Sequence, residues 1–268
     1  MYVDGTMYID VFRRFLVSHT ITKLTSPYYQ TSPYPTPTPT QVRALTHDAV
    51  DPLSPTIQKI LATWPTDAIF PVIDAYRAML AMPPPAPGRE ALKDAVRTIG
   101  PLPPAGSLGA VLNTIFTRPT AVPTRIVSLR LLSNLFAIDL LPIVIAPQLD
   151  YLLGLVSSTV EHVGTKGIAI AYTTFLMNAA VYLQKVTSAT AATSLTLANM
   201  AGTVLDQNDR EAVAPTSVIN ALLVIGTLRR ESLVKPSDIS GYIGAIRRLA
   251  TDAPDDTCRL VAAEVSTL

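Results

Sequence analysis

Three asparagines are the residues of this sequence whose type and spacing most suggest recognition chemistry. Asn134, Asn178 and Asn220 lie in otherwise apolar stretches, 44 and 42 residues apart. An amide in such a stretch needs a hydrogen-bond partner, because an unpaired buried polar group is costly. Each asparagine could bond a neighbouring repeat and hold a stack together, or it could bind the main chain of an extended peptide in a groove. The two roles are compatible, and the sequence leaves both open.

Three arginines are candidate contacts for an anionic ligand. Arg77 and Arg130 are embedded among apolar residues, and Arg130 lies four residues before Asn134, which puts the two on one helical face. A guanidinium binds carboxylates through paired hydrogen bonds. A single helical arginine can equally be solvated or belong to a structural ion pair. We predict a peptide-binding site made of Arg77, Arg125, Arg130, Asn134, Asn178 and Asn220.

Catalytic and metal-binding patterns are missing from the sequence. The only cysteine, Cys258, has no histidine within ninety residues, so a nucleophile would lack a nearby base in the chain. His19, His47 and His162 stand far apart, and none has a second ligand at helical spacing. Glycine-rich phosphate loops and paired-carboxylate motifs do not occur. We expect a buried thiol, no enzymatic activity, no metal and no cofactor.

Composition limits the class of partner and the compartment. The chain has 268 residues, of which 49% are hydrophobic and 15% charged, with a formal net charge of +1. Such a chain has no global field for nucleic acid or for an anionic membrane surface. One cysteine excludes an intramolecular disulfide framework and suits a reducing compartment. The most apolar region, 126–156, is interrupted by charges and prolines and is too short in apolar runs to span a membrane. We expect a cytoplasmic and/or nuclear protein that binds neither nucleic acid nor membrane.

The prolines divide the chain. Eighteen of the 23 prolines precede Thr124. The stretch 27–40 alternates proline and threonine without an apolar period, which favours an extended polyproline conformation. We predict a poorly ordered N-terminal arm and linker over 1–41 and one compact domain over 42–268.

The compact region has the periodicity of helices. Apolar residues recur three and four positions apart, and the proline-rich segments 82–88 and 100–106 must end helices. Trp64, the only tryptophan, is expected to anchor the first repeat in the core. A period of 42–44 residues is typical of armadillo or HEAT arrays, so we predict an all-α fold. Helices are expected at 57–62, 68–82, 89–99, 108–116, 123–139, 143–158, 166–185, 191–206, 210–229, 236–250 and 255–265.

Four stretches, in order, carry a resemblance to a known family. They are LATWPTDAIFPVIDAYRAMLAMP at 61–83, RIVSLRLLSNLFA at 125–137, FLMNAAV at 175–181 and NALLVIGTL at 220–228. Over roughly 42–265 the sequence resembles the PUL domain, the C-terminal domain of phospholipase-activating protein and its ubiquitin-homeostasis relatives.

This resemblance implies a fold and a partner. The fold is an armadillo-like, right-handed helical solenoid of about six repeats without catalysis of its own. Its groove takes the C-terminal tail of a hexameric AAA+ segregase, valosin-containing protein, in ubiquitin-dependent protein turnover. Contacts with ubiquitin-pathway proteins would run through other domains.

Two other classes of function stay open. The chain could be a structural or oligomerising helical repeat, which would show a large apolar patch in place of a polar trough. It could also be the C-terminal part of a thioredoxin-like or deubiquitinase-like enzyme, with the catalytic domain before Met1. Light scattering would test the first alternative, and an upstream reading frame would test the second.

Overall fold

The structure is a computed structural model that describes residues 59–60, 62–65, 68–81, 89–136, 145–186, 191–208 and 213–268. Every regular element in these ranges is helical, which confirms the all-α prediction. The predicted arm and linker at 1–41 lie outside the described residues. The α-helices are α4 (Phe70–Ala81), α5 (Arg89–Arg97), α6 (Leu108–Thr117), α7 (Val122–Asn134), α8 (Ala146–Val156), α9 (Lys166–Lys185), α10 (Ala191–Asn208), α11 (Pro215–Arg230), α12 (Ile243–Asp252) and α13 (Asp256–Thr267), and the 3-10 helices are η2 (Ser157–His162) and η3 (Pro236–Tyr242).

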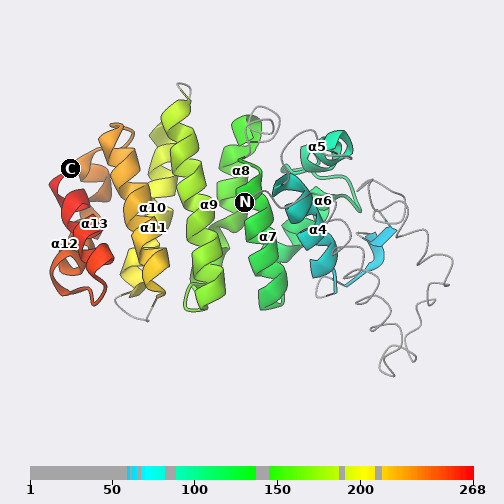
Figure 1. Ribbon diagram of the computed structural model, residues 1–268. Helices are drawn as coiled ribbons and strands as arrows, with labels where there is room; N and C mark the ends of the chain where they lie inside the picture. Colours follow the sequence, from blue (N-terminus) through cyan, green and yellow to red (C-terminus); the bar gives the residue numbers. More distant parts are fainter. Residues whose placement is uncertain are drawn as a thin grey trace, which may run out of the picture.

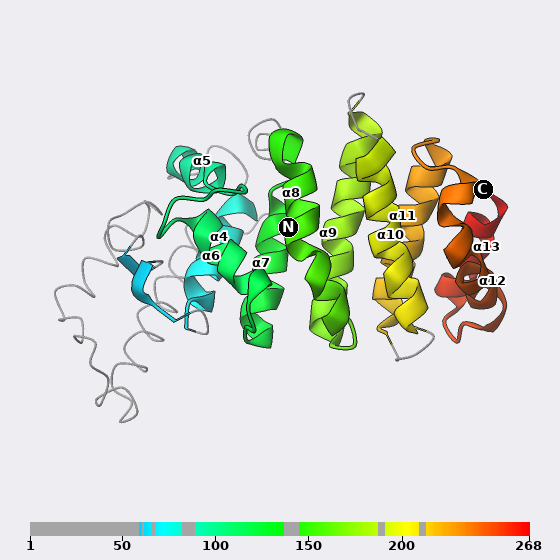
Figure 2. The same ribbon diagram turned by 180° about the vertical axis from the view of Figure 1, so that it is seen from behind.

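The helices form two layers (Figures 1 and 2). In the first layer α4, α7, α9, α11 and α13 pack side by side, each against the next. In the second layer α6, α8, α10 and α12 follow one another in the same way. The chain alternates between the layers, so α7, α9 and α11 run in one direction while α8 and α10 run back. This arrangement is that of a helical-repeat solenoid. Its handedness and its repeat number stay predictions.

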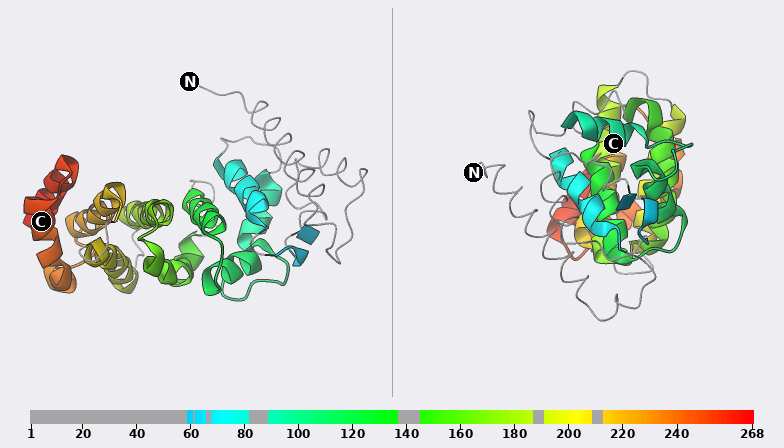
Figure 3. Two further views of the ribbon diagram at one scale, coloured as in Figure 1. Left: turned by 90° about the horizontal axis from the view of Figure 1, so that it is seen from below. Right: turned by 90° about the vertical axis from the view of Figure 1, so that its right-hand side faces the viewer.

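The first layer lies on the inner side of a shallow curve. Seen along the helices, α4 and α13 at the two ends of the row rise toward the same side (Figure 3). We call α4, α7, α9, α11 and α13 the inner layer. Each of its helices buries one apolar stripe in a continuous core and leaves the opposite stripe toward the inside of the curve.

Two glycines allow close packing within the inner layer. A Cβ added at Gly167 of α9 would lie 2.6 Å from Cδ1 of Ile126 on α7. A Cβ added at Gly226 of α11 would lie 2.9 Å from Cγ2 of Val265 on α13. Neighbouring helices therefore approach closely where these side chains are missing.

Most helix boundaries agree with the sequence predictions, and the exceptions have local causes. The helix over 166–185 has the predicted bounds. The predicted segment 143–158 continues past α8 into η2, and the predicted segment 236–250 begins as η3. The predicted start at 210 is wrong, because 213–214 are not helical and Pro215 opens α11 after an extended Ala214.

The predicted role of Trp64 is also wrong. Its side chain is 37% exposed. Trp64 closes a short helical turn in which its N–H donates to the carbonyl of Ile60, and Pro65 follows directly. Ile60, one turn earlier, is the side chain that packs against the core.

Candidate peptide-binding surface

The three predicted asparagines lie on neighbouring helices of the inner layer, α7, α9 and α11. Each amide donates from Nδ2 to the helix before it. Asn134 donates to the carbonyl of Arg77 at 2.9 Å, and Asn178 donates to the carbonyl of Ser133 at 3.1 Å. Asn220 donates to Oγ1 of Thr173 at 3.3 Å. The amides therefore link α4 to α7, α7 to α9 and α9 to α11, which is the stack-holding role that the sequence allowed.

The amides do not form a straight row. Asn178 bonds the residue next to Asn134, so these two lie nearly level. Asn220 bonds Thr173, five residues before Asn178, which corresponds to a step of about 7.5 Å at the rise of an α-helix. The near-constant sequence interval between the three asparagines hides this step.

Each amide keeps unused hydrogen-bonding capacity. A side-chain amide offers two N–H donors and one oxygen acceptor, and each of these asparagines uses a single N–H. The Oδ1 atoms of Asn134, Asn178 and Asn220 accept no hydrogen bond from any residue that the structure describes. All three side chains are half-buried and thus still reach solvent. The surface can therefore offer fixed acceptors to the N–H groups of a bound main chain.

The side chains around the amides are mostly apolar. They recur three or four positions apart on the stripe that carries each asparagine, opposite the buried stripe of the helix. Their partial exposure leaves apolar area that a ligand side chain could cover. They are Ile170, Thr174, Met177 and Val181 on α9, and Ile219 and Leu223 on α11.

Arg125 does not lie on this surface. Its side chain is 5% exposed, and its Nη2 donates to the carbonyls of Ile115 and Arg118 at 3.4 and 3.3 Å. Burial lowers the pKa of this guanidinium, and the charge of Glu161 opposes that shift. Arg125 therefore satisfies orphan carbonyls at the end of α6. The sequence prediction that Arg125 contacts a ligand is therefore not supported. Sequence reasoning could not find its actual role, because these carbonyls approach Arg125 only after α6 and α7 pack.

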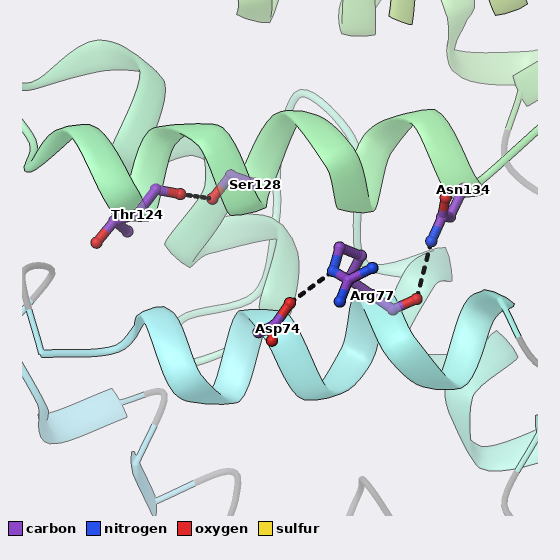
Figure 4. A network of polar contacts seen from close by, with 5 residues as sticks. All are labelled: Asp74, Arg77, Thr124, Ser128 and Asn134. Atoms are coloured by element: carbon purple, nitrogen blue, oxygen red, sulfur yellow. Dashed lines mark hydrogen bonds and ion pairs between the residues drawn. The ribbon is translucent and has the colours of Figure 1, made fainter. Parts of the chain in front are cut away.

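Arg77 and Arg130 differ in their partners (Figure 4). Arg77 lies on α4 and forms an ion pair with Asp74 of the same helix, with Nε 2.5 Å from Oδ1. The two side chains are 31% and 36% exposed. Arg130 on α7 is exposed, and it forms no ion pair or hydrogen bond through its side chain with the described part of the chain. Sequence reasoning missed Asp74, although its i,i+3 spacing to Arg77 was a usable signal.

The remaining chemistry of the described residues is sparse. They contain no group of three or more metal-ligating side chains, and none of their helices is long and apolar enough to cross a membrane. Cys258 is buried, as predicted, and burial together with the charge of Asp255 raises the pKa of its thiol. A raised pKa lowers the thiolate fraction and hence the reactivity of this cysteine.

Comparison with known proteins identifies the family. A search of curated proteins found no match. The family model for the PUL domain matches residues 20–262. The match covers α4 to α12 and the first half of α13, and it begins within the predicted arm. The geometry agrees with this result, since a layered helical array with anchored amides suits protein binding, and PUL domains are protein-binding helical domains without known catalysis. The chain belongs to the PUL domain family.

Proposed function

We propose that this domain is a peptide-binding adaptor whose inner layer captures the extended C-terminal tail of the hexameric AAA+ segregase, valosin-containing protein, in ubiquitin-dependent protein turnover. The observation that carries the proposal is the set of three asparagines with one N–H committed to the stack and Oδ1 left for a ligand. Membership of a family of protein-interaction domains supports it further. Such an adaptor would act in the cytoplasm and/or the nucleus, where its partner works.

The anchored amides lower the cost of binding. An asparagine that already bonds a neighbouring helix has lost most of its rotamer freedom before the ligand arrives, so less entropy is lost on binding. Main-chain N–H groups of the tail would donate to Oδ1 of Asn134 and Asn178, which lie nearly level. The step to Asn220 means that the tail would cross the inner layer obliquely to reach all three.

The charge and apolar contacts supply the rest of the affinity. Arg130 would pair with a carboxylate of the tail, and the half-buried side chains of α9 and α11 would cover its apolar groups. A hydrogen bond contributes about 1 kcal/mol and a solvated ion pair no more than about 1 kcal/mol. Micromolar affinity requires about 8 kcal/mol, so several contacts must act together. A hexameric partner would present several equivalent tails, which raises the chance that one is captured, and linked copies of the domain would add avidity.

The direct test is calorimetry with a peptide of the segregase's last ten or so residues. We expect Arg130→Ala to weaken binding by up to about fivefold, the equivalent of one solvated ion pair. The thermal midpoint should not change, since the side chain is exposed and bonds no described residue. Arg247→Ala is the matched control, because Arg247 is an exposed arginine on α12 of the other layer. Unchanged affinity in Arg130→Ala, or an equal loss in the control, would reject this site. Absence of binding by the unaltered domain would reject the partner.

A self-associating scaffold is the second candidate, because one end of the described array exposes apolar side chains. Leu102 is 93% exposed, and Trp64 is 37% exposed. The two segments are neighbours, since a Cβ added at Gly106 would lie 3.1 Å from Cβ of Ala62. Light scattering distinguishes the candidates: a dimer that Leu102→Asp converts to a monomer would favour the scaffold.

A further inference from the structure

The ion pair on α4 suggests how this surface distinguishes ligands by charge, an inference that rests on the proposed peptide binding and deepens it. Asp74 and Arg77 both reach from α4 toward α7 (Figure 4). The carbonyl of Arg77 also accepts the amide of Asn134, so the pair lies beside the first link of the stack. We propose that Asp74 is a specificity-determining residue that excludes ligand carboxylates from the α4 end of the surface and directs them to Arg130 on α7.

The geometry of the pair sets this preference. Oδ1 of Asp74 contacts Nε of Arg77, which leaves the two terminal nitrogens of the guanidinium without a partner in the described residues. Those nitrogens can still donate hydrogen bonds, but the pair as a whole carries no net charge. A carboxylate that approached them would meet the carboxylate of Asp74 at short range, and partial burial weakens solvent screening of that repulsion.

Arg130 offers the contrasting site on the next helix. Asn134 and Arg77 are level, because the amide of Asn134 bonds the carbonyl of Arg77. Arg130 lies one turn before Asn134, and Asp74 lies about one turn before Arg77, so Arg130 and Asp74 are at similar levels on the two helices. The guanidinium of Arg130 is exposed and bonds nothing that the structure describes, so its full charge is available. The surface therefore favours a segment with an acidic residue opposite α7 and an uncharged or basic residue opposite α4.

Two substitutions distinguish the negative charge of Asp74 from its role as the hydrogen-bond acceptor that holds Arg77. Asp74→Asn removes the negative charge and keeps a side-chain oxygen that can accept from Nε of Arg77. Asp74→Ala removes both the charge and the acceptor. Asp252→Asn is the control, because Asp252 is exposed on α12 and its change alters the net charge equally. Far-UV circular dichroism would establish that each variant is folded.

Calorimetry would use two peptides. The acidic peptide is the segregase tail with its free C-terminal carboxylate, and the neutral copy is amidated at the C-terminus and has every Asp and Glu replaced by Asn and Gln. We expect Asp74→Asn to bind the acidic peptide three- to tenfold more tightly, with a steeper decrease of affinity as salt is added, and to bind the neutral copy as before. Asp74→Ala should gain less, because Arg77 is no longer held. If Asp74 had a purely structural role, its substitution would change the affinity for both peptides alike and would leave the salt dependence of binding unaltered.

The outcomes separate this inference from the function on which it rests. If the unaltered domain binds the acidic peptide and Asp74→Asn binds it equally or more weakly, Asp74 does not select by charge. An equal gain in Asp252→Asn would overturn the inference too, because it would make the effect a general one of net charge. Absence of binding by the unaltered domain and by Asp74→Asn would overturn the proposed function together with the inference.

Discussion

The link between α7 and α9 and the link between α9 and α11 use the same residue type with different acceptors. Asn178 donates to the main-chain carbonyl of Ser133, whereas Asn220 donates to the hydroxyl of Thr173. A carbonyl is present whatever side chain the residue carries, but this hydroxyl exists only with threonine or serine. The first link therefore tolerates substitution at its acceptor, and the second depends on both residues.

The two contacts between helices also differ in their apolar packing. Phe136, just after α7, meets Phe175 of α9 edge to face with ring centroids 5.7 Å apart, and it meets Tyr182 at 6.2 Å. The structure gives no aromatic pair between α9 and α11 in its described part. Aromatic side chains thus reinforce the link whose acceptor is the main chain.

The largest expected effect comes from removing this aromatic packing. Phe175→Ala should lower the free energy of unfolding by about 3–5 kcal/mol, because Phe175 is fully buried and its removal leaves a cavity. Urea unfolding followed by circular dichroism would measure the loss. Phe175→Leu is the control, since it restores most of the apolar volume and should lose much less. Equal losses of unfolding free energy in the two variants would contradict this prediction, because they would show that the volume at this position does not determine the stability.

A smaller effect tests the two acceptors directly. Thr173→Val should lower the free energy of unfolding by about 1–2 kcal/mol, because Asn220 loses its only described partner. Ser133→Ala is the matched variant and should change it by less, about 0.5 kcal/mol, since the carbonyl that binds Asn178 remains and the lost hydroxyl bonds only the carbonyl of Leu129 within α7. A double-mutant cycle with Asn220→Ala would isolate the pair. The comparison fails if the two single variants are equally destabilised.

The smallest effect at neutral pH is expected at Tyr172, beside Thr173 on α9. The hydroxyl of Tyr172 is buried without a hydrogen-bond partner in the described residues. Tyr172→Phe removes this uncompensated desolvation cost and should raise the free energy of unfolding by up to about 1 kcal/mol at pH 7. Burial raises the pKa of Tyr172 above its usual value of 10. One hydroxyl of α9 thus serves a link between helices, and its neighbour serves none.

The stabilities of Tyr172→Phe and of the unaltered domain should differ more at alkaline pH. Above pH 10 the tyrosine ionises in the unfolded chain while the folded chain still holds the proton, so the unaltered domain loses stability as the pH rises. Tyr172→Phe lacks this contribution, so its advantage in stability over the unaltered domain should widen as the pH rises. Urea midpoints at pH 7, 9 and 10.5 would measure the difference. A constant difference across this range would contradict the assigned cause.

The sequence predicted the helices better than the contacts of the polar residues. Apolar periodicity sufficed for α9, since burial of one stripe depends only on residues along that helix. The role of Arg125 depends on carbonyls of α6 that reach it only after packing. The level of Asn220 depends on how far α11 slides along α9, and an interval counted along the chain does not fix that offset.

The shared direction of α7, α9 and α11 has an electrostatic consequence. Their peptide dipoles add, so the edge of the layer where they begin carries partial positive charge and the opposite edge partial negative charge. None of the three helices has an acidic residue in its first turn, while Lys185, Arg229 and Arg230 occupy the last turns of α9 and α11. No acidic side chain therefore reduces the partial positive charge at the first edge, whereas the basic side chains offset the partial negative charge at the opposite edge. A chain whose formal charges nearly cancel can in this way attract an anionic segment without a dense basic patch.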